Sequence, residues 1–148
     1  MVKMPPPIWM FLFLALAGAA SAIYPWKSII DPTVVPLGIA LVVLGFAIAF
    51  WGRLLFLVEK TEVIPTSEKN SKLVTRGAFS ITRNPMYLGL VILSLGIAFW
   101  VGSLPMFVVP VLVFIVCNQI HIPFEEAKMR RQYGDAFDAY TGKVRRWI

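Results

Sequence analysis

The stretch Leu73-Val-Thr-Arg-Gly-Ala-Phe-Ser-Ile-Thr-Arg-Asn-Pro-Met-Tyr-Leu-Gly89 lies between two strongly apolar segments. It combines arginines, hydroxyl groups and aromatic side chains, which indicates a polar site at a membrane surface. Asn84 is a favourable N-cap and Pro85 suits the first helical position, so a helix is predicted to begin here. The free amides and partial positive charge of such a helix start suit an anionic group. The alternative interpretation is a basic loop followed by a well-capped helix.

The composition predicts an integral membrane protein, because 58% of the 148 residues are hydrophobic and only 15% are charged. A soluble domain of this composition would leave too much apolar surface in water. A helix needs about 20 residues to cross roughly 30 Å of hydrocarbon. The sequence therefore predicts a single all-α membrane domain with about four transmembrane helices, at residues 8–24, 34–58, 85–101 and 104–122. A short linker makes the last two an antiparallel hairpin.

The lysines and arginines lie almost entirely on one side of these predicted spans. The N-terminus, the loop at residues 59–84 and the tail at residues 123–148 would share that side, and the opposite side holds only Lys27. By the positive-inside bias the crowded side is cytoplasmic, which predicts an inner-membrane protein with both termini in the cytoplasm. The net charge of +6 is then a sign of topology. No pattern typical of a nucleic-acid-binding module is present.

The first apolar segment has a second interpretation. Lys3, the apolar run from Ile8 and the small residues Ala20-Ser21-Ala22 also fit a signal peptide with its cleavage site. A retained span is favoured here, because a single cation and the prolines at residues 5–7 make a poor leader sequence.

Several residues inside the apolar segments have structural interpretations. Arg53 is expected to snorkel to the membrane surface, with a place in a substrate pocket as the alternative. Gly89, Gly96 and Ala98 would let neighbouring helices approach closely. Cys117 is the only cysteine, which excludes a disulfide within the chain, and it is expected to pack in the core. No metal site is predicted.

The fourth span is predicted to end in a break at Ile122, because Pro123 disfavours helix in the residue before it and can open a new helix. Glu125 and Glu126 would then lie in the first turn of a tail helix, where the helix dipole favours them. The lone His121 is expected either to be an interfacial histidine with its hydrogen bonds satisfied or to serve the site.

The tail is predicted to be an amphipathic cytoplasmic helix. Tyr133, Phe137 and Tyr140 follow one another at i, i+4 and i+7, which forms one apolar stripe suited to a membrane surface. Gly134 lies within this stripe although a helical glycine costs about 1 kcal/mol relative to alanine. It therefore indicates a close contact.

Four motifs follow one another in the C-terminal half of the chain, from about Ser71 to Ile148. They are Leu73-Val-Thr-Arg-Gly-Ala-Phe79, Arg83-Asn-Pro-Met-Tyr-Leu-Gly89, Glu125-Glu126, and Tyr133-Gly-Asp-Ala-Phe-Asp-Ala-Tyr140 with Val144-Arg-Arg-Trp147. In order and spacing they resemble the isoprenylcysteine carboxyl methyltransferase family, which belongs with the phospholipid methyltransferases. The resemblance implies a membrane enzyme that uses S-adenosylmethionine without a Rossmann domain. The absence of a glycine-rich dinucleotide turn agrees with this.

The resemblance also implies which residues hold S-adenosylmethionine and its product S-adenosylhomocysteine. The expected cofactor-binding residues are Ser71, Lys72, Leu73, Val74, Phe79, Arg83, Asn84, Pro85, Met86, Tyr87 and Glu125. Glu125 suits the ammonium group, and Arg83 with the amides after Asn84 suits the carboxylate. For an acceptor that must lose a proton, His121 and Glu126 are the candidate catalytic bases.

Two positions depart from the family pattern. Asn84 stands where the family usually has a histidine, and His121 stands where it has a substrate-side arginine. His121 and Arg53 are the candidate substrate-binding residues. The expected substrate is a lipophilic methyl acceptor that enters from the bilayer, and it is isoprenylcysteine-like, phospholipid-like or another apolar nucleophile. A neutral imidazole cannot grip a carboxylate as arginine does, so a neutral nucleophile is expected.

Two other functions fit the sequence. Membrane reductases of the sterol-reductase type share a similar C-terminal pattern, but they bind a nicotinamide cofactor whose size would be expected to need more spans than 148 residues supply. A small membrane protein without enzymatic activity, whose polar loops serve assembly, is the second alternative.

Overall fold

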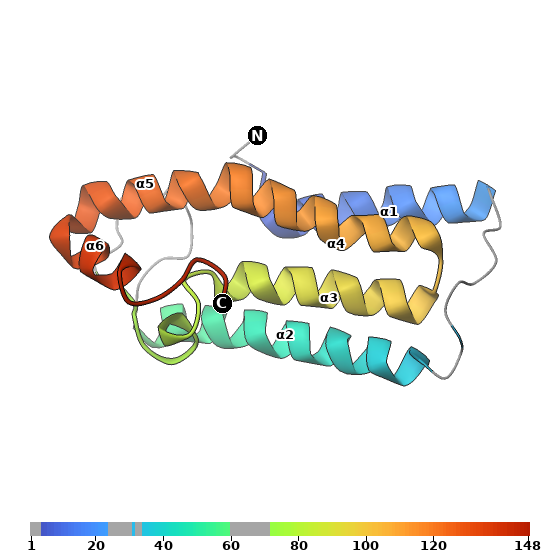
Figure 1. The fold of residues 1–148 in the computed structure, drawn as a ribbon, viewed down its shortest axis with the longest axis horizontal. Helices are drawn as coiled ribbons and strands as arrows, with labels where there is room; N and C mark the ends of the chain where they lie inside the picture. Colours follow the sequence, from blue (N-terminus) through green and yellow to red (C-terminus); the bar gives the residue numbers. More distant parts are fainter. Residues whose placement is uncertain (1–3, 24–30, 32–33, 60–71) are drawn as a thin grey trace.

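The computed structural model describes residues 4–23, 31, 34–59 and 72–148, and these residues form a bundle of helices (Figure 1). The elements are α1 (Pro6–Ile23), α2 (Val35–Val58), the 3₁₀ turn η2 (Gly77–Ser80), α3 (Pro85–Val101), α4 (Leu104–Val116), the π-turn η3 (Cys117–His121), α5 (Ile122–Tyr133) and α6 (Asp135–Thr141). The described residues contain no strand. The predicted all-α fold is therefore confirmed.

Helices α2 and α3 pack along their whole length through glycines spaced seven residues apart. Gly38, Gly45 and Gly52 are the buried residues of α2, and Gly89 and Gly96 face them from α3. A Cβ atom added to Gly45 would lie 2.6 Å from the carbonyl oxygen of Gly89, and one added to Gly96 would lie 2.7 Å from that of Gly38. The two backbones are thus in direct contact, which small residues make possible. The prediction for the two α3 glycines is confirmed.

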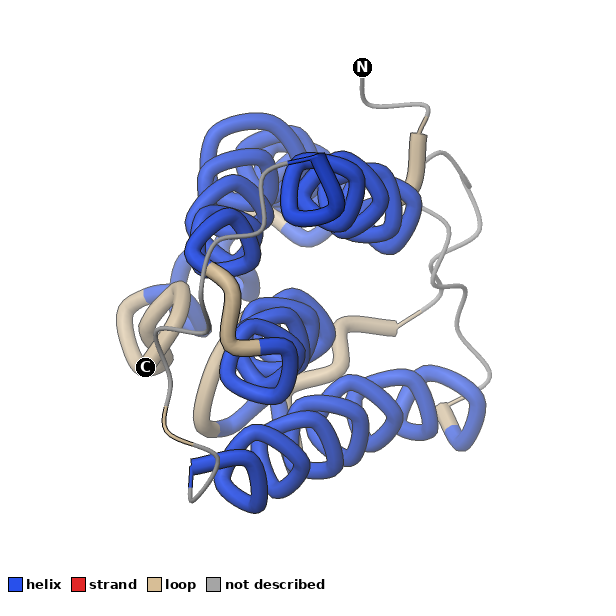
Figure 2. Tube along the Cα trace, turned by 90° about the vertical axis from the view of Figure 1, so that its right-hand side faces the viewer, coloured by secondary structure: helices blue, strands red, loops and turns tan. Residues whose placement is uncertain are grey.

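Helices α3 and α4 form the predicted antiparallel hairpin. Gly102 ends α3 with a φ of 71°, a left-handed conformation that glycine adopts without strain. Helix α1 packs on α4, and the hydroxyl groups of Ser21 and Ser103 lie 2.9 Å apart at this end of the bundle. The view along the bundle shows the long helices standing side by side (Figure 2).

The predicted break at Ile122 is wrong, because α4, η3 and α5 form one continuous helix of 30 residues, Leu104–Tyr133. The backbone amide of Ile122 donates to the carbonyl of Cys117, five residues back. This wider turn gives the ring of Pro123 room against the preceding carbonyl groups, so the helix continues through the proline. Glu125 and Glu126 therefore do not cap a free helix start. The predicted packing of Cys117 in the core is confirmed, since it is 1% exposed.

Three of the helices are long and apolar enough to cross a membrane: Pro6–Ile23, Val35–Val58 and Leu104–Tyr133. Helix α3 is apolar but only 17 residues long, and it contacts both α2 and α4 inside the bundle. Large apolar side chains such as Phe46 and Phe50 on α2 are exposed on the outer surface. These features support an integral membrane protein. A fourth span through α3 stays a prediction.

The predicted tail helix is divided at Gly134 into α5 and α6. Gly134 has a φ of 51°, and a Cβ atom added there would meet none of the described residues within 4 Å. The expected close contact is therefore wrong, and the glycine instead provides the positive φ of the bend. Phe137 and Tyr140 on α6 are buried with Val144 in a small cluster of their own.

Candidate functional site

A pocket lies at the end of the bundle where α3 begins. Its empty space is about 680 Å³, including the part open to solvent. It is lined by Phe56, Lys72, Leu73, Val74, Phe79, Arg83, Asn84, Pro85, Met86, Tyr87, Glu125, Glu126, Met129, Phe137 and Tyr140. Helices α2, α3, α5 and α6 and the turn η2 all contribute side chains, so segments far apart in the sequence meet here.

Most of the predicted site residues lie around this one pocket. They are Lys72, Leu73, Val74, Phe79, Arg83, Asn84, Pro85, Met86, Tyr87, Glu125 and Glu126. Ser71 lies outside the described residues. Their roles in binding stay predictions, but their convergence means that the sequence motifs describe one site.

Two predicted residues do not line the pocket. His121 is 1% exposed, and its ring centroid lies 6.3 Å from that of Tyr87. The Nε2 atom of His121 is buried without a hydrogen-bond partner in the part of the chain that the structure describes, and the interpretation as a satisfied interfacial histidine stays a prediction. Arg53 is exposed on α2, away from the pocket lining, as expected of a snorkelling side chain.

Four pocket residues were not predicted: Phe56, Met129, Phe137 and Tyr140. Phe56 belongs to the apolar run of α2, where nothing in the sequence separates it from residues that face lipid. Phe137 and Tyr140 had been assigned to a stripe on the membrane surface, but the bend at Gly134 turns them toward the pocket. Their i, i+3 spacing on α6 was the available signal.

The acidic part of the pocket is built on Tyr87 and Glu125. The hydroxyl group of Tyr87 donates a hydrogen bond to Oε1 of Glu125. Tyr87 comes from the first turn of α3 and is 6% exposed, and Glu125 comes from α5. The buried hydroxyl group holds this carboxylate in the pocket, where it can accept a cationic group.

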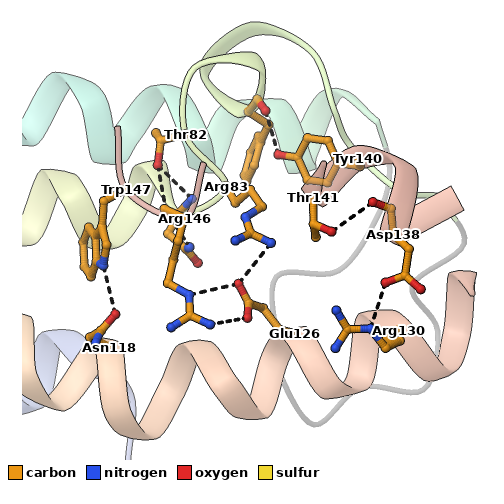
Figure 3. Close-up of polar contacts among 12 residues, drawn as sticks. Thr82, Arg83, Asn118, Glu126, Arg130, Asp138, Tyr140, Thr141, Arg146 and Trp147 are labelled. Carbon is orange, nitrogen blue, oxygen red and sulfur yellow. Dashed lines mark hydrogen bonds and ion pairs between the residues drawn. The ribbon is translucent and has the colours of Figure 1, made fainter. Parts of the chain in front are cut away.

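The basic side of the site contains two arginines and one carboxylate, and of these Arg83 and Glu126 line the pocket (Figure 3). Glu126 accepts two hydrogen bonds from Arg146, at 2.6 Å from Nη2 and 3.2 Å from Nε. Arg83 Nη1 lies 3.4 Å from Oε1 of the same carboxylate. Two cations share one anion, so this wall carries a surplus of positive charge.

The side chain of Asn84 does not cap α3, which corrects the sequence prediction. The backbone carbonyl oxygen of Asn84 accepts the first helical hydrogen bond, from the amide of Leu88 at 2.9 Å. The side-chain Nδ2 atom of Asn84 instead donates to the backbone carbonyl oxygen of Arg146, also at 2.9 Å. Thr82 Oγ1 donates to that same carbonyl at 3.2 Å. The side chain of Asn84 therefore hydrogen-bonds the C-terminal segment instead of capping α3. The first backbone amides of α3 receive no hydrogen bond from it and can donate to other groups.

Three further contacts hold the rim of the pocket. Glu59, just after α2, forms ion pairs with Lys72 and Arg76, and the hydrogen bond from Lys72 is the largest of the causes that lower the pKa of Glu59. Tyr140 donates a hydrogen bond to the carbonyl oxygen of Phe79 at 2.6 Å. Burial raises the pKa of Tyr140 to about 12, so its hydroxyl group keeps its proton at neutral pH.

Comparisons with known proteins bear on this site. The model of the phospholipid methyltransferase family matches residues 33–136. An uncharacterized protein of Haemophilus influenzae (strain ATCC 51907 / DSM 11121 / KW20 / Rd) is 33% identical over 63 residues, which is 43% of this chain and the whole of that protein. No solved structure matches the chain. The family match runs from the start of α2 into α6 and includes the pocket residues up to Met129.

Proposed function

We propose, because this chain belongs to the phospholipid methyltransferase family, that its pocket binds S-adenosylmethionine and that it methylates a lipophilic acceptor entering from the bilayer. Methyltransferase activity follows from the family in general. The observation that supports the finer proposal is that motif residues from both halves of the matched region line the same pocket.

The charges around the pocket fit the amino-acid end of S-adenosylmethionine. Its ammonium group needs a carboxylate, which Glu125 offers, and its carboxylate needs a cation, which Arg83 offers. The Nε atom of Arg83 is buried and has no hydrogen-bond partner among the described residues. A buried donor of this kind is costly until a ligand satisfies it. Phe79 and Phe137 supply apolar surface for the adenine ring.

The chain's contribution to methyl transfer would be alignment and exclusion of water. The cofactor supplies a methyl group on a sulfonium, which is an excellent leaving group, so the protein need only hold the acceptor in line and keep the site dry. Apolar lining residues such as Val74 and Met129 suit the second task. An acceptor with a proton to lose would need a base, and Glu126 is the predicted base that lines the pocket.

The position of Glu125 along its helix suits a substrate that comes from the membrane. Glu125 lies about 31 Å along the axis from Leu104, at about 1.5 Å per residue. This distance is close to the roughly 30 Å of hydrocarbon that a span crosses. The site would therefore lie at the membrane surface, where a lipid headgroup can reach it.

We place this surface on the cytoplasmic side of the inner membrane, because the predicted loops on the pocket side hold nearly all the cations. A cysteine introduced at Ser67 is expected to resist a membrane-impermeant thiol reagent in intact cells. Labelling from outside the cell would reverse this orientation. Cys117 is buried and serves as the internal background.

Ligand-induced stabilisation of the purified protein tests the proposed cofactor. S-adenosylhomocysteine at about 100 times its dissociation constant should stabilise the folded state by about 2.7 kcal/mol and raise the melting temperature. NADPH should leave the melting temperature unchanged. A shift with NADPH alone would support a reductase, and no shift with either ligand would favour a membrane protein without enzymatic activity.

The acceptor is expected to be a neutral lipophilic nucleophile. Neither His121 nor Arg53 lines the pocket, so neither supplies a fixed cation for an acceptor carboxylate. Lys72 is paired with Glu59, and Arg83 is assigned to the cofactor. Turnover of apolar amines and thiols should exceed that of a farnesylcysteine analogue by about tenfold in kcat/KM, equivalent to about 1.4 kcal/mol. Equal or faster methylation of the farnesylcysteine would contradict this.

A further inference from the structure

Arg146 joins two walls of the pocket although it does not line the pocket itself. Its carbonyl oxygen accepts hydrogen bonds from Thr82 and Asn84 beside the start of α3, and its side chain reaches Glu126 on α5 (Figure 3). The preceding carbonyl, that of Arg145, accepts a hydrogen bond from the backbone amide of Arg83 at 3.0 Å. The C-terminal segment therefore fixes both the backbone that carries Arg83 and the carboxylate beside it.

The two arginines compete for Glu126 on unequal terms. Arg146 makes two hydrogen bonds, at 2.6 Å and 3.2 Å, whereas the contact from Arg83 is a single one at 3.4 Å. A two-point arginine–carboxylate pair is the stronger arrangement. The carboxylate is thus satisfied mainly by Arg146, and the guanidinium of Arg83 keeps a buried Nε atom without a hydrogen-bond partner in the described part of the chain.

We propose that Arg146 is a positioning residue that keeps Glu126 from drawing Arg83 out of the pocket. With Arg146 in place, Arg83 stays available to an anionic group of the ligand, and the carboxylate of S-adenosylmethionine is the group that the proposed function supplies. The inference rests on that proposed function. Without the Arg146 side chain, Glu126 would need another cation, and Arg83 is already in contact with it.

Other contacts hold the C-terminal segment independently of the Arg146 side chain. Trp147 Nε1 donates to Asn118 Oδ1 at 3.0 Å, and the Trp147 ring lies 4.8 Å from that of Phe114. The carbonyl bonds to Thr82 and Asn84 belong to the backbone and survive a change of side chain. Replacing Arg146 therefore removes the ion pair while the segment stays in place.

Calorimetric titration with S-adenosylhomocysteine tests the inference. Arg146→Gln should bind it about 10-fold or more weakly than wild type, the effect of weakening a hydrogen bond to a charged group, with the melting temperature of the free protein nearly unchanged. Arg131→Gln makes the same change at an exposed position of α5 and should bind like wild type. Arg146→Lys, which keeps the charge but loses the two-point contact, should lie between them.

The double variant Glu126→Gln/Arg146→Gln distinguishes positioning from simple support of the fold. Removing the carboxylate leaves nothing to capture Arg83, so affinity should recover to within about threefold of wild type, a coupling expected of residues in contact. A double variant that binds more weakly than Arg146→Gln would overturn the positioning role. Equal affinity in wild type and Arg146→Gln would also overturn it and leave the proposed function intact. A wild type that does not bind S-adenosylhomocysteine would overturn both.

Discussion

Replacing Gly45 with alanine will destabilise the bundle, although alanine normally stabilises a helix. The new Cβ atom would lie 2.5 Å from the amide nitrogen of Leu93 and 2.6 Å from the carbonyl oxygen of Gly89. Both are backbone atoms, so the helices α2 and α3 must move apart along their shared face. We expect a loss of about 1–3 kcal/mol, as for other overpacked cores, and a larger loss for Gly45→Leu. Thermal unfolding followed by circular dichroism in detergent measures it.

Gly18→Ala is the matched control. Among the described residues, a Cβ atom at Gly18 of α1 would meet only the terminal methyl group of Met106, at 3.7 Å, which is an ordinary contact. Alanine favours a helix by about 1 kcal/mol relative to glycine. The free energy of unfolding of Gly18→Ala should therefore be equal to or greater than that of wild type. If Gly45→Ala proved as stable as Gly18→Ala, the direct backbone contact between α2 and α3 would be disproved.

Glu125→Gln is expected to weaken binding of S-adenosylhomocysteine by about 1.5–3 kcal/mol, the range for a hydrogen bond to a charged group. The amide keeps the size of the carboxylate and can still accept a hydrogen bond from Tyr87, but it cannot balance the ammonium charge. Calorimetry of the variant measures the change. Because Glu125 points at a neutral hydroxyl group, its loss should disturb the fold little.

Glu126→Gln is the comparison for this variant. Glu126 lies next to Glu125 in the sequence but is already paired with Arg146 and Arg83. We expect Glu126→Gln to retain most of its affinity. Unchanged affinity in Glu125→Gln with a large loss in Glu126→Gln would move the ammonium site one residue along the chain.

The sequence was sufficient for the parts of the fold that depend on local pattern. Apolar runs predicted α2 from residues 34–58 and α3 from residues 85–101, close to Val35–Val58 and Pro85–Val101 in the structure. The short polar link after α3 predicted the hairpin. The resemblance of the motifs to the methyltransferase family predicted most of the side chains that meet around the pocket. The fold brings them together because the start of α3 and the Glu125-Glu126 pair lie near the same end of antiparallel helices.

Other features of the site could not be predicted, because they depend on contacts between residues far apart in the sequence. Asn84 reads as a helix cap, and only the fold shows that the carbonyl of Arg146 takes its side chain. His121 reads as a site residue because of its place before Glu125, but it is buried in the core of the bundle. The spacing of Gly38 and Gly45 was visible in the sequence, yet in an apolar run it does not identify which helix it faces.

At the π-turn Cys117–His121 the structure depends on the number of residues in the turn as well as on which residues they are. Such a turn holds one residue more than an α-helical turn, and each residue of an α-helix advances the direction of the side chains by about 100°. Removing one residue from the turn would leave an ordinary α-helical turn, so the side chains of α5 would keep nearly their present directions and Glu125 would stay beside Tyr87. The wide turn itself would be lost, and with it the room that it gives the ring of Pro123 against the preceding carbonyl groups. A one-residue deletion in the turn should therefore strain the helix at Pro123, and the number of residues between Val116 and Ile122 is fitted to this proline.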